Sequence, residues 1–332
     1  MRYIFVFATL FCLTTQHSSA QQFSVLFYNT ENLFDTIDQS GTYDEEFTPY
    51  GKNEHTGERY WMKIDHLSKV INASDEKGCS GLIGLCEVEN AAVVRDMKDA
   101  LDCGDKYQVL HFESPDMRGI DNALLIDRSR FELLDSGLEP IELGAEERPT
   151  RGILWGKVMH KETETSFFVY VNHWPSRYGG KELSAPKRMR ASATQIDLIE
   201  SHRKADPDAH VIVMGDLNDH PQDESVQALV DCDTGACLDN LVEHIQTMGE
   251  GTHAYRGDWG VLDHLLVSRD LMNAQRGWSV ESDAGRTVSY EWMMYKNEDS
   301  GNLFPSRFYG SNAFYGGYSD HLPVRFEVNY LD

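Results

Sequence analysis

Short runs of consecutive apolar residues recur along the chain, and most of them end in polar residues. Val211–Met214 is the plainest case, because four apolar residues indicate a buried strand and Gly215 then breaks it. Comparable runs predict further strands, and Ile153–Met159 is expected to pair antiparallel with Ser166–Val171. The other predicted strands are Phe23–Tyr28, Gly81–Cys86, Tyr107–Phe112, Asn122–Ile126, Phe131–Leu134, Leu262–Ser268 and Leu322–Val328.

Helical periodicity fills several of the intervals between these strands. Apolar residues recur at helical spacing from Trp61 to Ile71, on one face of a predicted helix. Further helices are expected at about Ala91–Leu101 and over Asp223–Val230. Ser184 and Pro186 favour the start of another helix, whose buried stripe would be Met189, Ala193, Ile196 and Ile199.

This mixture of strands and helices predicts a layered α/β arrangement, with sheets inside and helices outside. Residues 35–60 are acidic, contain glycine and show weak periodicity, so we expect a surface loop there. No internal repeat, low-complexity segment or linker interrupts the pattern. A single domain over residues 21–332 is therefore the simplest interpretation.

The first 20 residues have the pattern of a cleaved secretory signal. One basic residue precedes an apolar run from Tyr3 to Leu13, and small residues end at Ala20. The run falls short of the roughly 18 to 20 apolar residues that span a membrane, so a stable insertion is disfavoured. Lipid modification of Cys12 is disfavoured by the bulky Phe11 before it. We expect a periplasmic or secreted protein.

Five cysteines follow the predicted signal. Cysteines of an exported protein can form disulfides, and Cys232 with Cys237 is the local candidate pair. The odd number leaves at least one free thiol, and Cys86 lies within an apolar run. No CxxC spacing typical of a metal site occurs.

The charge of the chain limits its partners. The net charge is −24, which works against broad contact with phosphate backbones or anionic membranes. Locally, the segment from His173 to Lys204 holds seven Lys or Arg residues and three acids, which favours an anion site with Arg177 as its best candidate. A solvated helix face explains Arg203 and Lys204 better.

Polar residues that follow or begin the predicted strands suggest a shared site. Strand ends from one sheet edge can converge on one pocket, although each residue alone could be a cap or a turn residue. The set is rich in carboxylates and amides, which suit Mg²⁺ or Mn²⁺, and its histidines fit acid–base roles better than a closed zinc site. Its members are Asn29, Glu87, Asn172, His173, Asp216, Asn218, Asp263, His264, Asp320 and His321.

With these residues in order, the chain resembles the endonuclease/exonuclease/phosphatase superfamily, which includes DNase I-like nucleases, exonuclease III-like repair enzymes, sphingomyelinases and inositol polyphosphate 5-phosphatases. The resemblance implies a four-layer α/β/β/α sandwich of two packed mixed sheets flanked by helices, and Mg²⁺-dependent phosphoester hydrolysis. It runs from about Phe23 to Val328. Its motifs are FYNTENLF, GLCEVEN, RGIDNALL, VNHWPSR, GDLND, LDHLLVS and SDHLP.

The resemblance also implies roles for individual residues. Glu87 would be the main metal carboxylate, with Asn29 and Asp320 near it. Asp216 would align or deprotonate the attacking water, while His321, oriented by Asp263, would protonate or stabilise the phosphate. Asn218 would hold a phosphate oxygen, and His173 would act on the leaving-group side. Substrate contacts are expected from Asn172, Arg177 and Arg118.

Departures from the family patterns bear on the substrate. The chain lacks the signatures of the 5-phosphatase and repair branches, and Glu89 stands where DNase I-like members carry an arginine that touches DNA. Ten aromatic residues between Trp278 and Tyr318 could stack bases, cover a lipid or sugar, or simply pack. We expect a monomeric phosphodiesterase or nuclease. The alternatives are a lipid or small-molecule phosphatase or phosphodiesterase and, more remotely, a non-catalytic secreted binding module.

Overall fold

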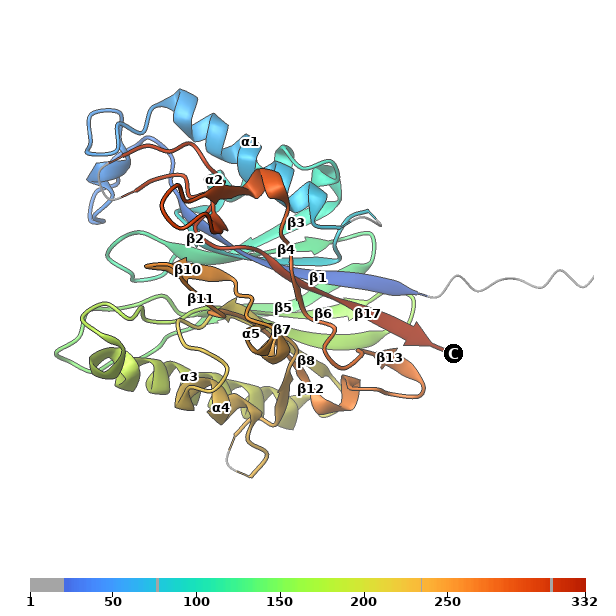
Figure 1. The fold of residues 1–332 in the computed structure, drawn as a ribbon. Coiled ribbons are helices and arrows are strands. Elements are labelled where there is room, and N and C mark those ends of the chain that lie inside the picture. Colours follow the sequence, from blue (N-terminus) through green and yellow to red (C-terminus); the bar gives the residue numbers. More distant parts are fainter. Residues whose placement is uncertain (1–20, 76–77, 234, 311–312) are drawn as a thin grey trace, which may run out of the picture.

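The computed structural model describes residues 21–75, 78–233, 235–310 and 313–332, so the predicted signal segment lies outside it. Two β-sheets stack face to face, and helices cover their outer faces (Figure 1). Helices α1 (Gly57–Ala73) and α2 (Ala91–Asp99) cover one sheet; α3 (Lys181–Ala205) and α4 (Glu224–Val230) cover the other. The expected four-layer sandwich is confirmed.

The first sheet has seven strands in the order β13-β17-β1-β2-β4-β3, with β14 also paired to β17. Only β1 and β2 run parallel among these pairs; the others are antiparallel. The strands are β1 (Gln22–Leu33), β2 (Leu82–Val88), β3 (Tyr107–His111), β4 (Asp121–Asp127), β13 (Gly277–Ser279), β14 (Arg286–Thr287) and β17 (Val324–Leu331).

The second sheet has six strands in the order β5-β6-β7-β8-β12-β9. Here β7 and β8 are parallel and the other pairs antiparallel, including the expected β6–β7 pair. The strands are β5 (Phe131–Glu139), β6 (Ile153–His160), β7 (Thr165–His173), β8 (His210–Asp216), β9 (Leu238–Asn240) and β12 (Asp263–Ser268).

Shorter elements complete the described chain. Two hairpins, β10–β11 and β15–β16, stand apart from the main sheets. In the described ranges, no helix has both the length and the apolar character needed to cross a membrane. The remaining elements are β10 (His253–Tyr255), β11 (Asp258–Gly260), β15 (Met294–Lys296), β16 (Leu303–Pro305), α5 (Glu243–Thr247) and the 3₁₀ turns η1 (Glu45–Phe47), η2 (Gly104–Lys106), η3 (Arg269–Leu271) and η4 (Glu291–Met293).

The topology explains why polar strand ends meet. In each sheet a helix connects the parallel pair: α1 joins β1 to β2, and α3 joins β7 to β8. Strands β17 and β12 run antiparallel to β1 and β8, so their starts lie beside the ends of those strands. In Figure 1, β1 runs from right to left, which places this edge at the left of the view.

The core between the sheets is apolar and tightly packed. Phe27 of β1 and Met214 of β8 are fully buried in the same cluster. A side chain at Gly84 in β2 would overlap the Met214 sulfur, so the glycine lets the sheets approach closely.

Helix α3 departs from the predicted pattern. Met189 and Ala193 are exposed, and the buried face is partly polar, with Arg188, Ser192 and Gln195. The reason is an internal ion pair, because the Arg188 guanidinium lies 2.7 Å from a carboxylate oxygen of Asp219. On α1 the buried face is as predicted except for Trp61, which is 55% exposed.

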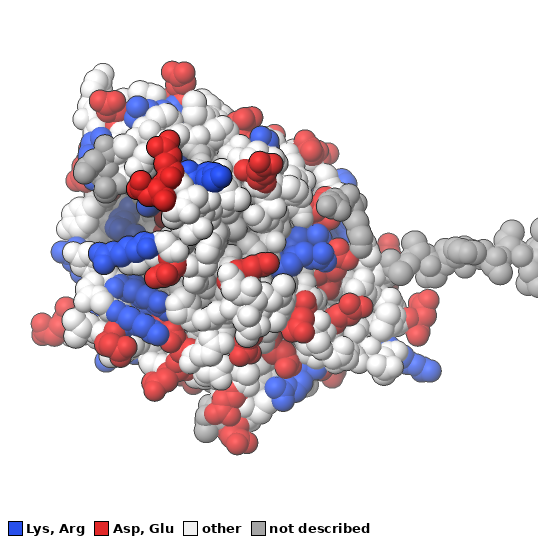
Figure 2. All heavy atoms as spheres, viewed as in Figure 1, with Lys and Arg blue, Asp and Glu red and all other residues white. Residues whose placement is uncertain are grey.

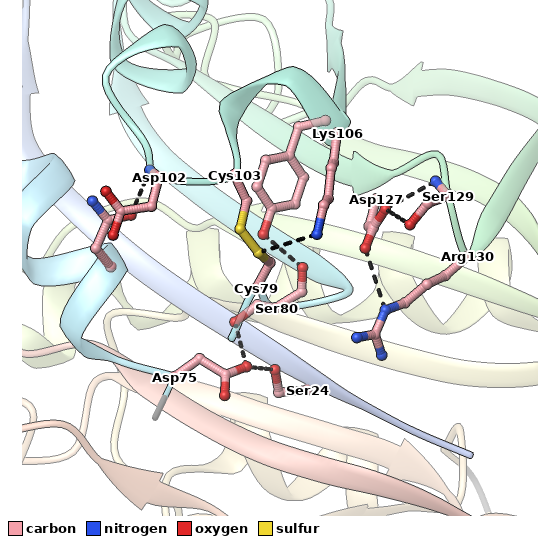
Figure 3. The surroundings of a disulfide bond; sticks show 12 residues. Ser24, Asp75, Cys79, Ser80, Asp102, Cys103, Lys106, Asp127, Ser129 and Arg130 are labelled. Atoms are coloured by element: carbon pink, nitrogen blue, oxygen red, sulfur yellow. Dashed lines mark hydrogen bonds and ion pairs between the residues drawn. A yellow bond between two sulfur atoms is a disulfide. The ribbon is translucent and has the colours of Figure 1, made fainter. Parts of the chain in front are cut away.

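Two disulfides link described cysteines. Cys232–Cys237 was predicted, and Cys86 is the buried free thiol. Cys79–Cys103 was not predicted, since pairing over 24 residues cannot be read from sequence alone. This disulfide joins the segment before β2 to the segment before β3. Figure 3 shows it beside Lys106.

Candidate active site

Glu87 and Asn29 are aimed into the site by irregularities in their strands. Strand β2 bulges between Cys86 and Val88, and Glu87 itself has a φ of 58°, which few non-glycine residues adopt. The backbone amide of Asn32 donates to the Glu87 carboxylate at 2.9 Å. Strand β1 bulges just after Asn29. Such strain is concentrated at functional sites, where a side chain must be held in one direction.

Asn29 connects the two sheets. Its side-chain nitrogen donates to an Asp216 carboxylate oxygen at 3.1 Å, and its amide oxygen accepts from the Glu31 backbone at 2.9 Å. Ser319, one residue before Asp320, donates its hydroxyl to the Asn29 carbonyl. Asn29 thus positions residues of β8 and of the segment before β17.

Asp216, Asp263 and His321 form the buried centre of the site. The pairing of β8 with β12 sets Asp216 directly opposite Asp263. The His321 Nδ1 atom lies 2.7 Å from Asp263, and its Nε2 atom lies 3.8 Å from Asp216. Burial alone would lower the pKa of His321, yet the two carboxylates hold it well above its usual value. The two carboxylates therefore favour the protonated form of His321, whose Nε2 atom is directed toward Asp216.

Asp216 is held by both neighbouring segments. Burial raises the pKa of this carboxyl to about 7, although the positive His321 opposes the shift. Asn218, at φ 53°, donates its backbone amide to Asp216 at 2.9 Å and its side-chain nitrogen to the Trp174 carbonyl. Gly215 is required because a Cβ there would lie 2.5 Å from the Asn172 carbonyl oxygen.

His173 lies between the two carboxylate groups of the site. Its Nε2 atom is 3.7 Å from Glu87 and 3.8 Å from Asp216. Burial lowers the pKa of His173 well below its usual value, so the ring is neutral. A neutral imidazole can donate one hydrogen bond to a bound phosphate or leaving oxygen without adding charge.

The donor set fits a divalent cation with a preference for oxygen ligands. Glu87 and Asp320 are both partly exposed carboxylates, and the Asn29 amide oxygen lies at the same edge. Asp216, Asp263 and His321 also have potential ligand atoms within 4.8 Å of one another. Because His321 already pairs with Asp263, the residues that could hold a cation at this edge are Glu87, Asn29 and Asp320.

A charge cluster beside Asp320, in which Glu31 and Lys63 are buried and Arg307 is exposed, was not predicted. Arg307 lies 3.3 Å from Glu31 and 3.0 Å from Asp320, and Glu31 accepts the backbone amides of Phe308 and Tyr309. Burial lowers the pKa of Lys63 to about 8, and its ammonium has no hydrogen-bond partner among the described residues. The signals available were a polar Glu31 in a buried strand and Lys63 on an apolar helix face.

His253 is a second omission from the prediction. It forms a backbone bridge with His321, and the two rings are 4.6 Å apart. Its hairpin is too short to be recognised by periodicity, so no sequence signal linked it to the site.

The structure places the three predicted substrate contacts in different surroundings. Asn172 is fully buried, and its amide bonds Gln195 and Trp174, so we correct its role from substrate contact to packing of α3 on β7. Arg118 is half-exposed near Asp116. Arg177 lines a pocket but is paired with Asp219 and Asp223.

Asp219 and His220, which follow Asn218, both make side-chain contacts with neighbouring segments. Asp219 is buried between Arg188 and Ser225, and His220 contacts Arg177 and the Val261 carbonyl. Other basic residues of the expected anion segment are also paired: Lys181 with Asp223 and Lys187 with Glu147.

The aromatic insert mainly packs. Tyr290, Trp292 and Tyr318 contact the cluster under α1, and Phe308 is fully buried with Phe34. Tyr295, Phe314 and Tyr315 remain exposed. This favours the packing alternative for most of the ten residues.

Charge on the face seen in Figure 1 is unevenly distributed. Figure 2 shows acidic and basic side chains intermixed over most of it, with Lys and Arg gathered at the left edge, between the layers of α1 and α3. This is the edge where the strand ends converge. The negative net charge therefore does not extend uniformly to the site.

Comparison with known proteins agrees with this geometry. The model of the endonuclease/exonuclease/phosphatase family matches residues 24–330. Among solved structures, a family member from Bacteroides thetaiotaomicron is 15% identical with a TM-score of 0.59, over 94% of this chain and 96% of that one. No curated protein sequence matches.

Two further similar structures are of proteins with a named ligand or substrate. Zebrafish (D. rerio) TDP2 complexed with a single-strand DNA product is 14% identical with a TM-score of 0.58, covering 93% of this chain and 99% of that one. A mannosyl-6-phosphatase from Bacteroides thetaiotaomicron is 16% identical with a TM-score of 0.55, covering 92% and 99%. At such identities the likeness establishes the fold. With the family model matching nearly all of the described chain, the protein belongs to the endonuclease/exonuclease/phosphatase family of phosphoester hydrolases.

Proposed function

We propose that the protein is an exported, monomeric hydrolase that uses Mg²⁺ or Mn²⁺ and cleaves phosphodiesters by water attack on phosphorus. The observation that carries the proposal is the position of Asp216. One of its carboxylate oxygens lies 3.1 Å from Asn29 and 3.8 Å from both His173 and His321, so the residues expected for phosphoester chemistry surround it.

Each residue of the site would have a distinct role in the hydrolysis. Asp216 accepts the proton of the attacking water, and its two oxygens are already oriented by Asn29 and Asn218. His321, fixed by Asp263, directs Nε2–H at the charge that develops on the phosphoryl oxygens. His173 donates to the leaving oxygen. A cation held by Glu87, Asn29 and Asp320 would neutralise phosphate charge.

Export is supported by two observations. The first 20 residues have a signal-like pattern, and two disulfides join four of the cysteines. Disulfides persist in oxidising compartments and are uncommon in the cytosol. Both observations support our proposal that the enzyme acts in the periplasm or outside the cell.

A second candidate substrate class is supported by the surroundings of the site. Two basic residues near the centre, Arg177 and Lys181, are both paired with Asp223. These two cations are therefore already paired, which lowers their contribution to binding an extended phosphate backbone and favours a small-molecule or lipid phosphoester over long nucleic acid.

A substrate panel with Mg²⁺ or Mn²⁺ tests the proposal. It contains plasmid DNA, RNA, sphingomyelin, inositol phosphates and simple phosphodiesters. Wild type and the surface variant Asp208→Asn should hydrolyse the same members, whereas Asp216→Asn and His321→Ala should lose at least about a hundredfold in kcat. Equal turnover by all four proteins would refute the site assignment.

A further inference from the structure

A pocket of about 750 Å³ opens beside the catalytic centre. It lies between the segment after β7, the residues after β8 and the β10–β11 hairpin. Asn218 and His253 line it, and these residues also contact the centre: Asn218 orients Asp216, and the His253 ring lies 4.6 Å from the His321 ring. A substituent of a phosphate bound at Asp216 and His321 would therefore lie in this pocket.

Two tyrosines stand at the pocket with their rings in solvent. Tyr178 is 93% exposed and Tyr255 is 64% exposed, although both line the pocket. Among the described residues, neither ring stacks on another aromatic ring; only the Arg256 guanidinium lies over Tyr255. Large exposed aromatic faces beside a cleft are available for stacking with a ligand.

The hairpin that carries Tyr255 is well fixed. Its turn residues Arg256 and Gly257 have φ values of 53° and 94°, as in a two-residue type I′ turn. The Trp259 ring stacks on Phe304 at 6.1 Å, which anchors the outer strand to β16. His253 and Tyr255 are two residues apart in β10, so both side chains point to the same side of the hairpin.

Both cations that line the pocket are paired with carboxylates. Arg177 and Lys181 are 2.9 Å and 2.6 Å from Asp223, and Arg177 is also 3.3 Å from Asp219. Burial lowers the pKa of His220, so this ring adds no charge at neutral pH. Asp258 adds a carboxylate to the wall. A second phosphate would find no unpaired cation among these residues to offset its charge. An uncharged group does not need such a cation.

We propose that this pocket binds a single uncharged ring carried by the phosphoester, stacked against Tyr178 and Tyr255, and that it thereby sets substrate specificity. The shared chemistry is a flat ring face with polar substituents, as in a nucleoside or a hexose. The proposal rests on the proposed phosphoesterase function and names its substrate class: small or chain-end esters with a ring beside the reacting phosphate.

Steady-state kinetics with three ester types test the inference. The substrates are a methyl ester of a nucleoside phosphate, a methyl ester of a hexose phosphate, and an open-chain glycerol phosphate methyl ester. Tyr178→Ala and Tyr255→Ala should raise KM for at least one ring-bearing ester by about tenfold, the scale of base–aromatic stacking, and leave kcat unchanged. Tyr178→Phe and Tyr255→Phe should retain the wild-type KM.

Tyr50→Ala is the matched control, since Tyr50 is fully exposed and lies outside the pocket. The ester whose KM responds identifies the ring as nucleoside or sugar. An unchanged KM for both ring-bearing esters, or an equal rise for the glycerol ester, would overturn the inference.

Calorimetric binding of a nucleoside phosphate and a hexose phosphate separates this inference from the proposed function. Tyrosine-dependent binding without any hydrolysis would refute the function but retain the pocket. Hydrolysis with binding that is insensitive to both tyrosines would refute the pocket alone.

Discussion

At the scale of residues, the site depends on a few side chains held in uncommon directions. Glu87 and Asn218 adopt left-handed backbone conformations, and Asn29 precedes a bulge. The types and order of these residues were predictable because they occur in recognisable motifs. The charge cluster of Glu31, Lys63 and Arg307 was missed because the Glu31–Arg307 contact joins positions 276 residues apart in the chain. Only the folded arrangement brings them together.

Replacing Asp263 tests how His321 is positioned. Asp263→Asn keeps the size of the side chain but removes the charge that holds the imidazolium. We expect kcat to fall by at least about a hundredfold, with a lower pKa for His321 measured by NMR. Asp239→Asn in the neighbouring β9 should retain activity. An unshifted His321 resonance would contradict the assigned pairing.

A buried histidine away from the catalytic centre predicts acid sensitivity. His55 contacts the Tyr309 hydroxyl and the Phe34 carbonyl, and burial lowers its pKa to about 4. The unfolded chain binds this proton near pH 6.5, so stability is complete above that pH and is lost as pH falls toward 4.

The expected loss from His55 is about 2–3 kcal/mol at pH 4, from about 1.4 kcal/mol per pKa unit. Urea unfolding between pH 7 and pH 4 measures it, with His55→Gln giving a flatter profile than wild type. Parallel profiles for the two proteins would show that His55 does not contribute.

At the scale of elements, two parallel strand pairs connected by helices create the site. The strands were predicted well because their apolar runs are continuous, and the β6–β7 pairing followed from their adjacency. The buried face of α3 was predicted wrongly. One of its polar residues, Arg188, pairs with the buried Asp219, and hydrophobic periodicity cannot reveal such an ion pair. The small hairpin β10–β11 was not predicted because strands of three residues are too short to show a hydrophobic pattern.

The close approach of the sheets at Gly84 gives an element-scale prediction. Gly84→Ala places a methyl group against Met214 and Phe27 and should destabilise the protein by about 1–3 kcal/mol. Gly57→Ala, in open space in the first turn of α1, should be neutral or mildly stabilising. Urea midpoints of the two variants measure the difference; equal midpoints would disprove close packing at Gly84.

At the scale of the whole molecule, the acidic surface predicts weak dependence on salt. A substrate held through a single phosphate should lose about fourfold or less in affinity between 50 and 200 mM salt, whereas six or more phosphate contacts would cost about a thousandfold. KM measured over this range decides between the two. A steep dependence would favour extended nucleic acid as the substrate.

The central claim is that Asp216 directs water to phosphorus. Hydrolysis of bis(p-nitrophenyl) phosphate in ¹⁸O-enriched water with Mn²⁺, followed by mass spectrometry of both products, tests it most directly. The account predicts one ¹⁸O atom in the phosphate-bearing product, none in the phenol, and loss of turnover in Asp216→Asn. Label in the phenol, or full turnover by Asp216→Asn, would contradict it.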